Sequence, residues 1–170
     1  MGSFRNPALA DDVFQASICG LLAIANGAGK ILWGFVLDKL GVDKTFAALT
    51  GAQALAFIIL PLSAVHDPGM FAACCLLVSS SLGGYFAIFP AANAAAFGPE
   101  RAPQVYVLLF TAFAVSSVVG VSGTRALMAA LPASVGWPPL LRGMAVTSLL
   151  SMGLIRLKGS KKTQMRPVVA

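Results

Sequence analysis

The sequence predicts an all-α integral membrane protein, on three observations. First, its 170 residues are 58% hydrophobic and only 11% charged, whereas soluble domains carry about 25% charged residues. Second, residues 45–65, 68–99 and 102–124 contain no acidic, basic or histidine residue, and a membrane-spanning helix needs roughly 20 mostly apolar residues. Third, the apolar stretches are continuous rather than alternating, which favours helices over membrane strands.

The apolar stretches predict five membrane-spanning helices. Besides the three charge-free stretches, residues 16–37 are interrupted only by Lys30, and residues 138–155 only by Arg142. Residues 1–12 would precede the bundle as an N-terminal extension, and residues 157–170 would follow it as a basic tail. The predicted spans are residues 13–38, 45–65, 69–97, 103–123 and 139–156.

Two features of the third span bear on packing. Gly83 and Gly84 lie near its centre, and small residues let helix backbones approach closely in lipid. Pro90 predicts a kink or a break near the inner end of the span. We therefore expect a tightly packed bundle with one interrupted helix.

Basic residues set the predicted orientation. The net charge is +6, and five basic residues follow the last span: Arg156, Lys158, Lys161, Lys162 and Arg166. No aromatic residues are interleaved among them, so we predict no nucleic-acid partner. By the positive-inside rule this tail is cytoplasmic, and the lipid bilayer is the predicted partner. A tail that binds a specific lipid is a less favoured alternative.

Enzymatic chemistry is not predicted. His66 is the single histidine, and the three cysteines lie inside predicted helices. The sequence has no Cys-x-x-Cys pair, no glycine-rich phosphate loop after a strand and no paired carboxylates within a span. We therefore predict no catalytic residue, no metal site and no cofactor.

The connection after the first span carries a motif. Gly34 is followed by Asp38, Lys39, Gly41 and Lys44, so that a carboxylate and a basic residue end the helix before a glycine that permits a tight turn. This pattern resembles the cytoplasmic-loop signature of the major facilitator superfamily. The resemblance implies that these five residues form a structural loop whose carboxylate braces a helix end of the opposite half of the transporter.

Three helical segments extend the resemblance. The stretches ANGAGKILWGFVLDKLG, YFAIFPAANAAAFGPE and VYVLLFTAFAVSSVVG are similar to the eighth, tenth and eleventh helices of the monocarboxylate transporter and oxalate/formate antiporter group. The resemblance covers residues 13–156. It implies the C-terminal half of a twelve-helix fold, helices eight to twelve, in a chain that is a fragment or needs another membrane chain. Helices two to six are an alternative, because the two halves are related by an internal repeat.

The resemblance also implies roles for two residues of the first span. In this group an arginine that binds the substrate carboxylate usually stands where Lys30 stands. Lys30 keeps the positive charge of the arginine but lacks the two parallel N–H donors of a guanidinium group. Asn26 lies one turn earlier on the same helix face. Phe113 stands where oxalate-type members often carry a second basic residue. Lys30 and Asn26 are therefore the predicted substrate-binding residues, for a small organic anion.

Other readings stay open. Lys30 can also snorkel towards the membrane surface or form an inert pair. For the polar residues within the spans, interhelical hydrogen bonds are favoured over a role in lining a substrate pathway. These residues are Gln53, Tyr85, Asn93, Tyr106, Thr111 and Ser116.

Two functions follow from these assignments. The leading hypothesis is transport of a small, monocarboxylate-like organic anion as part of a major-facilitator carrier, in which the N-terminal half is supplied from elsewhere. The alternative is a small, non-transporting integral membrane protein that acts as an assembly or partner subunit.

Overall fold

The computed structural model describes residues 9, 11–131 and 137–160, with side chains up to residue 155. Within these ranges the chain forms four helices and no strand, which confirms the predicted all-α class. The helices are α1 (Asp12–Leu40), α2 (Val42–His66), α3 (Pro68–Ala130) and α4 (Pro138–Ser160). Most of the predicted N-terminal extension, and the basic tail beyond residue 160, lie outside the described residues.

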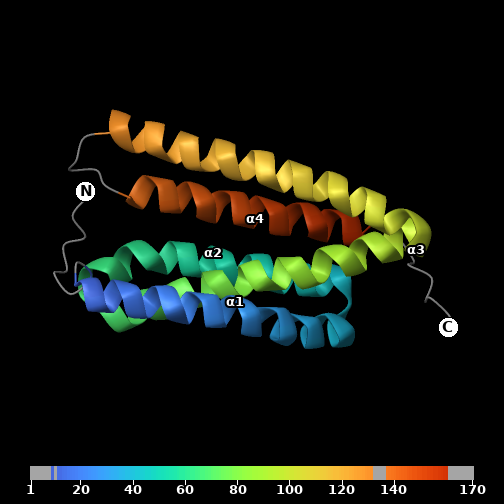
Figure 1. The fold of residues 1–170 in the computed structure, drawn as a ribbon, viewed down its shortest axis with the longest axis horizontal. Helices are drawn as coiled ribbons and strands as arrows, with labels where there is room; N and C mark the ends of the chain where they lie inside the picture. Colours follow the sequence, from blue (N-terminus) through green and yellow to red (C-terminus); the bar gives the residue numbers. More distant parts are fainter. Residues whose placement is uncertain (1–8, 10, 132–136, 161–170) are drawn as a thin grey trace.

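The third helix, α3, contains two of the predicted spans. Its backbone is non-helical at Gly98, where φ is 76° and ψ is 165°, a conformation that favours glycine. Figure 1 shows that α3 turns back on itself at one end of the bundle. We call residues 68–97 the early arm and residues 99–130 the late arm. Gly98 lies in the connection expected between the spans 69–97 and 103–123, whereas the helix is not broken at Pro90. Pro99 suits the first position of the late arm, which needs no N–H donor.

Capping residues mark the ends of α1 and α2 and the start of α3. The side chain of Asp11 accepts a hydrogen bond from a backbone N–H in the first turn of α1, at 3.3 Å. Gly41, with φ of 76°, ends α1, and α2 begins at the next residue. The connection is therefore shorter than the gap between the predicted spans 13–38 and 45–65. Asp67 ends α2 and also caps α3, accepting from the backbone N–H of Gly69 at 2.8 Å.

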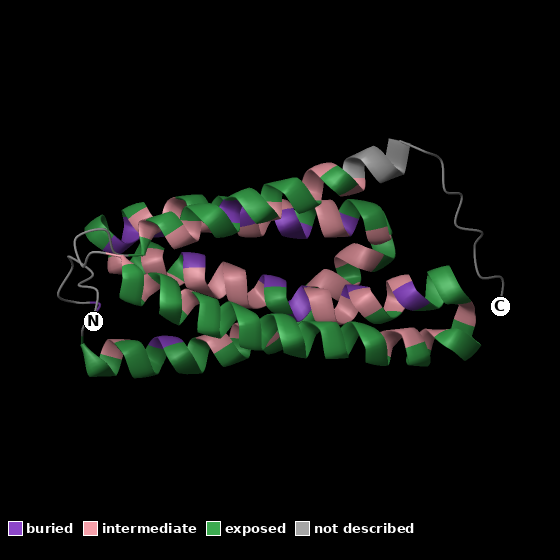
Figure 2. Cartoon of the chain, turned by 90° about the horizontal axis from the view of Figure 1, so that it is seen from above, coloured by how far each residue is buried: buried purple, intermediate pink, exposed green. Residues whose placement is uncertain are grey.

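The core of the bundle is thin and lies mainly around α2. Its buried cluster joins Ala56 and Leu60 of α2 to Cys74 of the early arm, with Leu141 of α4 packed against them. In Figure 2 exposed residues cover most of the chain and buried residues form short patches. Residues 107–123 of the late arm are all exposed. A large apolar surface is therefore available to lipid or to other helices.

Candidate functional site

The face of α1 that carries Asn26 and Lys30 lies against the early arm of α3. The side-chain nitrogen of Asn26 donates a hydrogen bond to the backbone carbonyl of Ser79, at 3.4 Å. In the other direction, the hydroxyl of Ser79 donates to the backbone carbonyl of Leu22, at 2.7 Å. These two hydrogen bonds join α1 to the early arm one to two turns before Lys30.

Glycines bring the two backbones into contact at the level of Lys30. A Cβ built on Gly83 would collide with the carbonyl oxygen of Asn26 and would lie 3.1 Å from the backbone nitrogen of Lys30. A Cβ built on Gly29 would lie 2.8 Å from the Cα of Ser80. Residues with larger side chains would therefore separate the helices here, and the close approach expected at Gly83 is present.

The side chain of Lys30 ends over an aromatic ring. It is exposed, and its Nζ lies 5.6 Å from the centroid of the Phe86 ring. Within the described part of the chain, Lys30 forms no ion pair. A cation over a ring face gains about 0.5–1 kcal/mol at an exposed site. The ring therefore offers the ammonium a weak partner and leaves its hydrogen-bond donors available.

Phe86 is also a wall of an aromatic cavity between the two arms of α3. The cavity measures about 510 Å³, within the range of roughly 300–1,000 Å³ typical of small-molecule sites. Leu82, Leu109, Ala112 and Ser116 complete its lining. Its aromatic members are Tyr85, Phe86, Phe89, Tyr106, Phe110 and Phe113.

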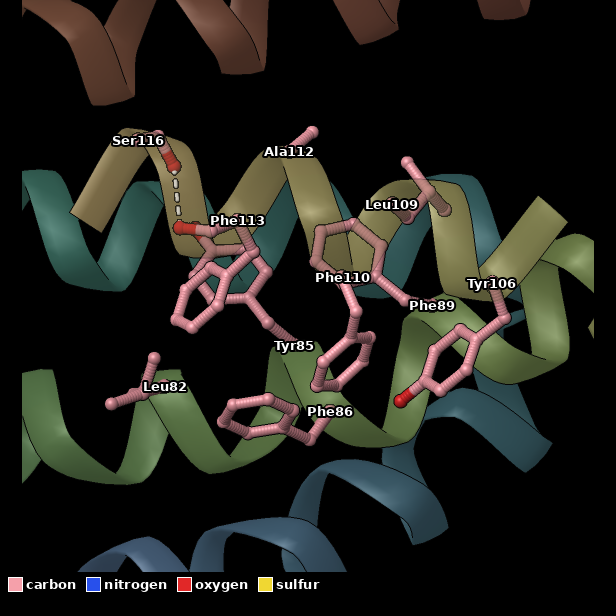
Figure 3. Close-up of a pocket in the computed structure, with 10 residues that line it drawn as sticks. All are labelled: Leu82, Tyr85, Phe86, Phe89, Tyr106, Leu109, Phe110, Ala112, Phe113 and Ser116. Carbon is pink, nitrogen blue, oxygen red and sulfur yellow. Dashed lines mark hydrogen bonds between the residues drawn. The ribbon is translucent and has the colours of Figure 1, made fainter. Parts of the chain in front are cut away.

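The rings of the cavity come from both arms and face one another, as Figure 3 shows. The centroid of Phe86 lies 5.8 Å from that of Phe110 and 5.9 Å from that of Phe113, the latter pair edge to face. Tyr106 packs on Phe110 at 4.6 Å. Ring pairs at these separations attract one another, so the two pairs that Phe86 forms hold the late arm against the early arm beside the cavity.

A second cavity, of about 390 Å³, is lined by residues of α1, α2 and the early arm and shares Tyr85 with the aromatic cavity. Gln53 and Ser79 contribute polar atoms to its lining. The hydroxyl of Tyr85 donates to the side-chain oxygen of Gln53 at 2.7 Å. Of the polar residues singled out within the spans, these two thus form an interhelical hydrogen bond.

The five residues of the loop motif lie together at the far end of α1 and the start of α2. Gly34 is half-buried, whereas Asp38, Lys39 and Lys44 are exposed and form no ion pair with any described residue. Gly41 supplies the positive φ of the turn. The charged residues of the motif are separate from Lys30, because Asp38 follows Lys30 by eight residues, which span about 12 Å of helix.

Sequence reasoning alone did not identify the aromatic cavity. Nothing in the sequence singles out Phe86 or Phe110. Phe113 was noted only because it stands where related oxalate transporters often carry a basic residue. A signal was present in the late arm, where Tyr106, Phe110 and Phe113 follow one another at spacings of four and three residues. Such spacing places side chains on one helix face, but it does not reveal which helix that face meets.

Comparison with known proteins identifies the family. Residues 7–168 match the model of the Major Facilitator Superfamily. The chain belongs to this superfamily. Members of the superfamily are transporters rather than enzymes. The chain is therefore an integral membrane protein, and four helices within its described residues are long and apolar enough to cross a membrane.

Three relatives of this major-facilitator chain are named after small carboxylates. It is 30% identical over 129 residues to the oxalate:formate antiporter of Oxalobacter formigenes, a match that covers 76% of this chain and 30% of the antiporter. It is 31% identical over 103 residues to apicoplast pyruvate carrier 2 of Toxoplasma gondii, covering 61% of this chain and 16% of the carrier. For apicoplast pyruvate carrier 1 of the same organism the identity is 33% over 108 residues, covering 61% and 19%. The chain thus spans less than a third of the length of these curated relatives.

Proposed function

We propose that the chain is part of a carrier of small, monocarboxylate-like organic anions and that Lys30 binds the carboxylate. The observation that carries the proposal is the position of the Lys30 ammonium, exposed at the edge of an aromatic cavity with Nζ 5.6 Å from the Phe86 centroid. The relatives support the same chemical class, because oxalate, formate and pyruvate are all carboxylates.

The energetics of Lys30 favour an anionic ligand. A lysine near the centre of a membrane helix costs about 2.5–3.5 kcal/mol on insertion scales. Contact with the Phe86 ring offsets about 0.5–1 kcal/mol of that cost. A carboxylate hydrogen-bonded to the ammonium would offset more, because charge-assisted hydrogen bonds are roughly twice as strong as neutral ones.

Asn26 is the second proposed ligand. Its side-chain NH₂ group has two donors, and one of them is used in the hydrogen bond to the backbone carbonyl of Ser79. This bond orients the amide on the face of α1 that carries Lys30. The second N–H is then available to the carboxylate that Lys30 binds.

Transport would require a second set of helices. We assign to Gly34, Asp38, Lys39, Gly41 and Lys44 the structural role of the superfamily's loop motif, in which the exposed Asp38 braces a helix of an opposite transporter half. That half would be an N-terminal part of the same polypeptide or another membrane chain. The short span of this chain relative to its relatives supports the proposal.

Uptake measurements in native membranes test the role of Lys30. Lys30→Gln removes the charge and keeps a polar side chain, so we expect uptake of labelled pyruvate to fall at least tenfold at unchanged protein level. Lys30→Arg should retain uptake, because it keeps the charge. Arg142→Gln is the matched control, since it removes an exposed cation from α4. Unchanged uptake in Lys30→Gln would contradict the proposal.

A second candidate function is a non-transporting partner subunit. The exposed late arm favours it, because Val107, Leu108 and Val118 are each at least 64% exposed and suit contact with another protein's helix. Photocrosslinking from these positions in native membranes distinguishes the two functions. A partner unrelated to transporters, together with unchanged uptake in Lys30→Gln, would favour the subunit.

A further inference from the structure

The aromatic cavity is far larger than a two- or three-carbon acid requires. Its volume is about 510 Å³, in the range of sites that enclose drug-sized molecules. A two-carbon anion held at Lys30 would leave most of that space unfilled. Apolar cavities gain most from ligands that fill them with apolar surface.

None of the described side chains that line the cavity is charged. The ammonium of Lys30 lies outside the lining, over the ring of Phe86, which forms one wall. Phe113, 5.9 Å from Phe86, presents an apolar ring to the cavity, which is open on the exposed side of the late arm. A second carboxylate would lie among these rings without a cation, which is strongly unfavourable.

We propose that the cavity selects monocarboxylates with an apolar ring or branched chain, and that Phe86, Phe110 and Phe113 determine this preference. The inference rests on the proposed function, because it places the carboxylate on Lys30. The body of the ligand lies between the early and late arms, where the faces and edges of the three rings contact it. Oxalate and other dicarboxylates are excluded by the lack of a second cation.

Equilibrium binding to the full chain in lipid nanodiscs provides the test. The probe is labelled phenylpyruvate, which carries one carboxylate and one phenyl ring. Unlabelled pyruvate, oxalate and phenylacetone compete with it. Phenylacetone has the ring and the ketone but no carboxylate. We expect phenylpyruvate to bind at least tenfold more tightly than pyruvate, and we expect oxalate and phenylacetone not to compete.

Two sets of variants locate the contacts. Lys30→Gln should weaken phenylpyruvate binding at least tenfold. Phe113→Ala should reduce the ratio of phenylpyruvate to pyruvate affinity at least fivefold. Phe113→Leu, which keeps apolar volume but removes the ring, serves if the alanine variant does not fold. Phe35→Ala is the control, because Phe35 is 63% exposed on α1 and does not line the cavity.

The outcomes separate this inference from the function on which it rests. If pyruvate or oxalate binds through Lys30 and phenylpyruvate does not bind more tightly, the ring preference is wrong and the carrier proposal stands. If no carboxylate binds in a Lys30-dependent manner, both proposals fail. The inference is also overturned if Phe113→Ala leaves the affinity for phenylpyruvate unchanged. The same holds if phenylacetone binds as tightly as phenylpyruvate.

Discussion

Gly83 of α3 lies directly against the backbone of Lys30 of α1, with 3.1 Å between the Lys30 nitrogen and the position of a Cβ on Gly83. The helix that carries the ammonium is therefore in backbone contact with the arm that carries Phe86. The proposed anion site depends on this contact, because a shift of α1 would move Nζ away from the ring.

Gly83→Ala should disrupt this contact. The added methyl group would collide with the Asn26 carbonyl oxygen, and overpacking of this kind costs about 1–3 kcal/mol. We expect the free energy of unfolding, measured in mixed micelles, to fall by that amount, and we expect carboxylate binding to weaken. Gly27→Ala is the matched control, since no atom lies within 4 Å of its Cβ position. Equal effects of the two substitutions would show that the contact is unimportant.

Tyr85→Phe should loosen the contact between α2 and the early arm. It removes the hydroxyl that donates to the Gln53 side chain at 2.7 Å, a type of bond worth about 0.6 kcal/mol on average between membrane helices. We expect a loss of about 0.5–1.5 kcal/mol in the free energy of unfolding. Tyr106→Phe should change little, because the Tyr106 hydroxyl has no hydrogen-bond partner in the described part of the chain. A larger loss in Tyr106→Phe would contradict this assignment.

Gly98→Ala should strain the turn that returns the late arm to the early arm. With φ at 76° and ψ at 165°, this backbone region is essentially restricted to glycine, and other residues pay about 1–3 kcal/mol there. We expect reduced stability and weaker phenylpyruvate binding, because the cavity is built from both arms. Gly120→Ala, in the open surface of the late arm, is the control. A stable variant with intact binding would show that the turn tolerates a side chain.

The orientation predicted from charge can be measured directly. An epitope tag after the basic tail should become accessible to protease only when cells are permeabilised, because the tail is predicted to be cytoplasmic. In a variant without native cysteines, Asp67→Cys, in the exposed connection between α2 and α3, should react with a membrane-impermeant maleimide in intact cells. The opposite labelling pattern would reverse the orientation.

Much of the fold could be predicted from local sequence. The apolar stretches predicted helices, and the structure has helices over those stretches. Gly41 was expected at a tight turn and has the positive φ that such turns need. The turn at Gly98 lies between the predicted spans 69–97 and 103–123, where a connection was expected. A break near Pro90 is absent, although Pro90 lacks a hydrogen-bond donor, and Pro90 remains within the helix.

The sequence by itself determined the membrane class, the loop motif and the anomaly of Lys30, because apolar length, glycine conformation and an isolated charge are local properties. The tertiary structure decided what surrounds that charge. Phe86 and Phe113 are 27 positions apart in the chain, and their rings meet because Gly98 folds the late arm back onto the early arm. Since a cavity is formed by the faces of different segments, its aromatic character emerged only when those faces were placed opposite one another.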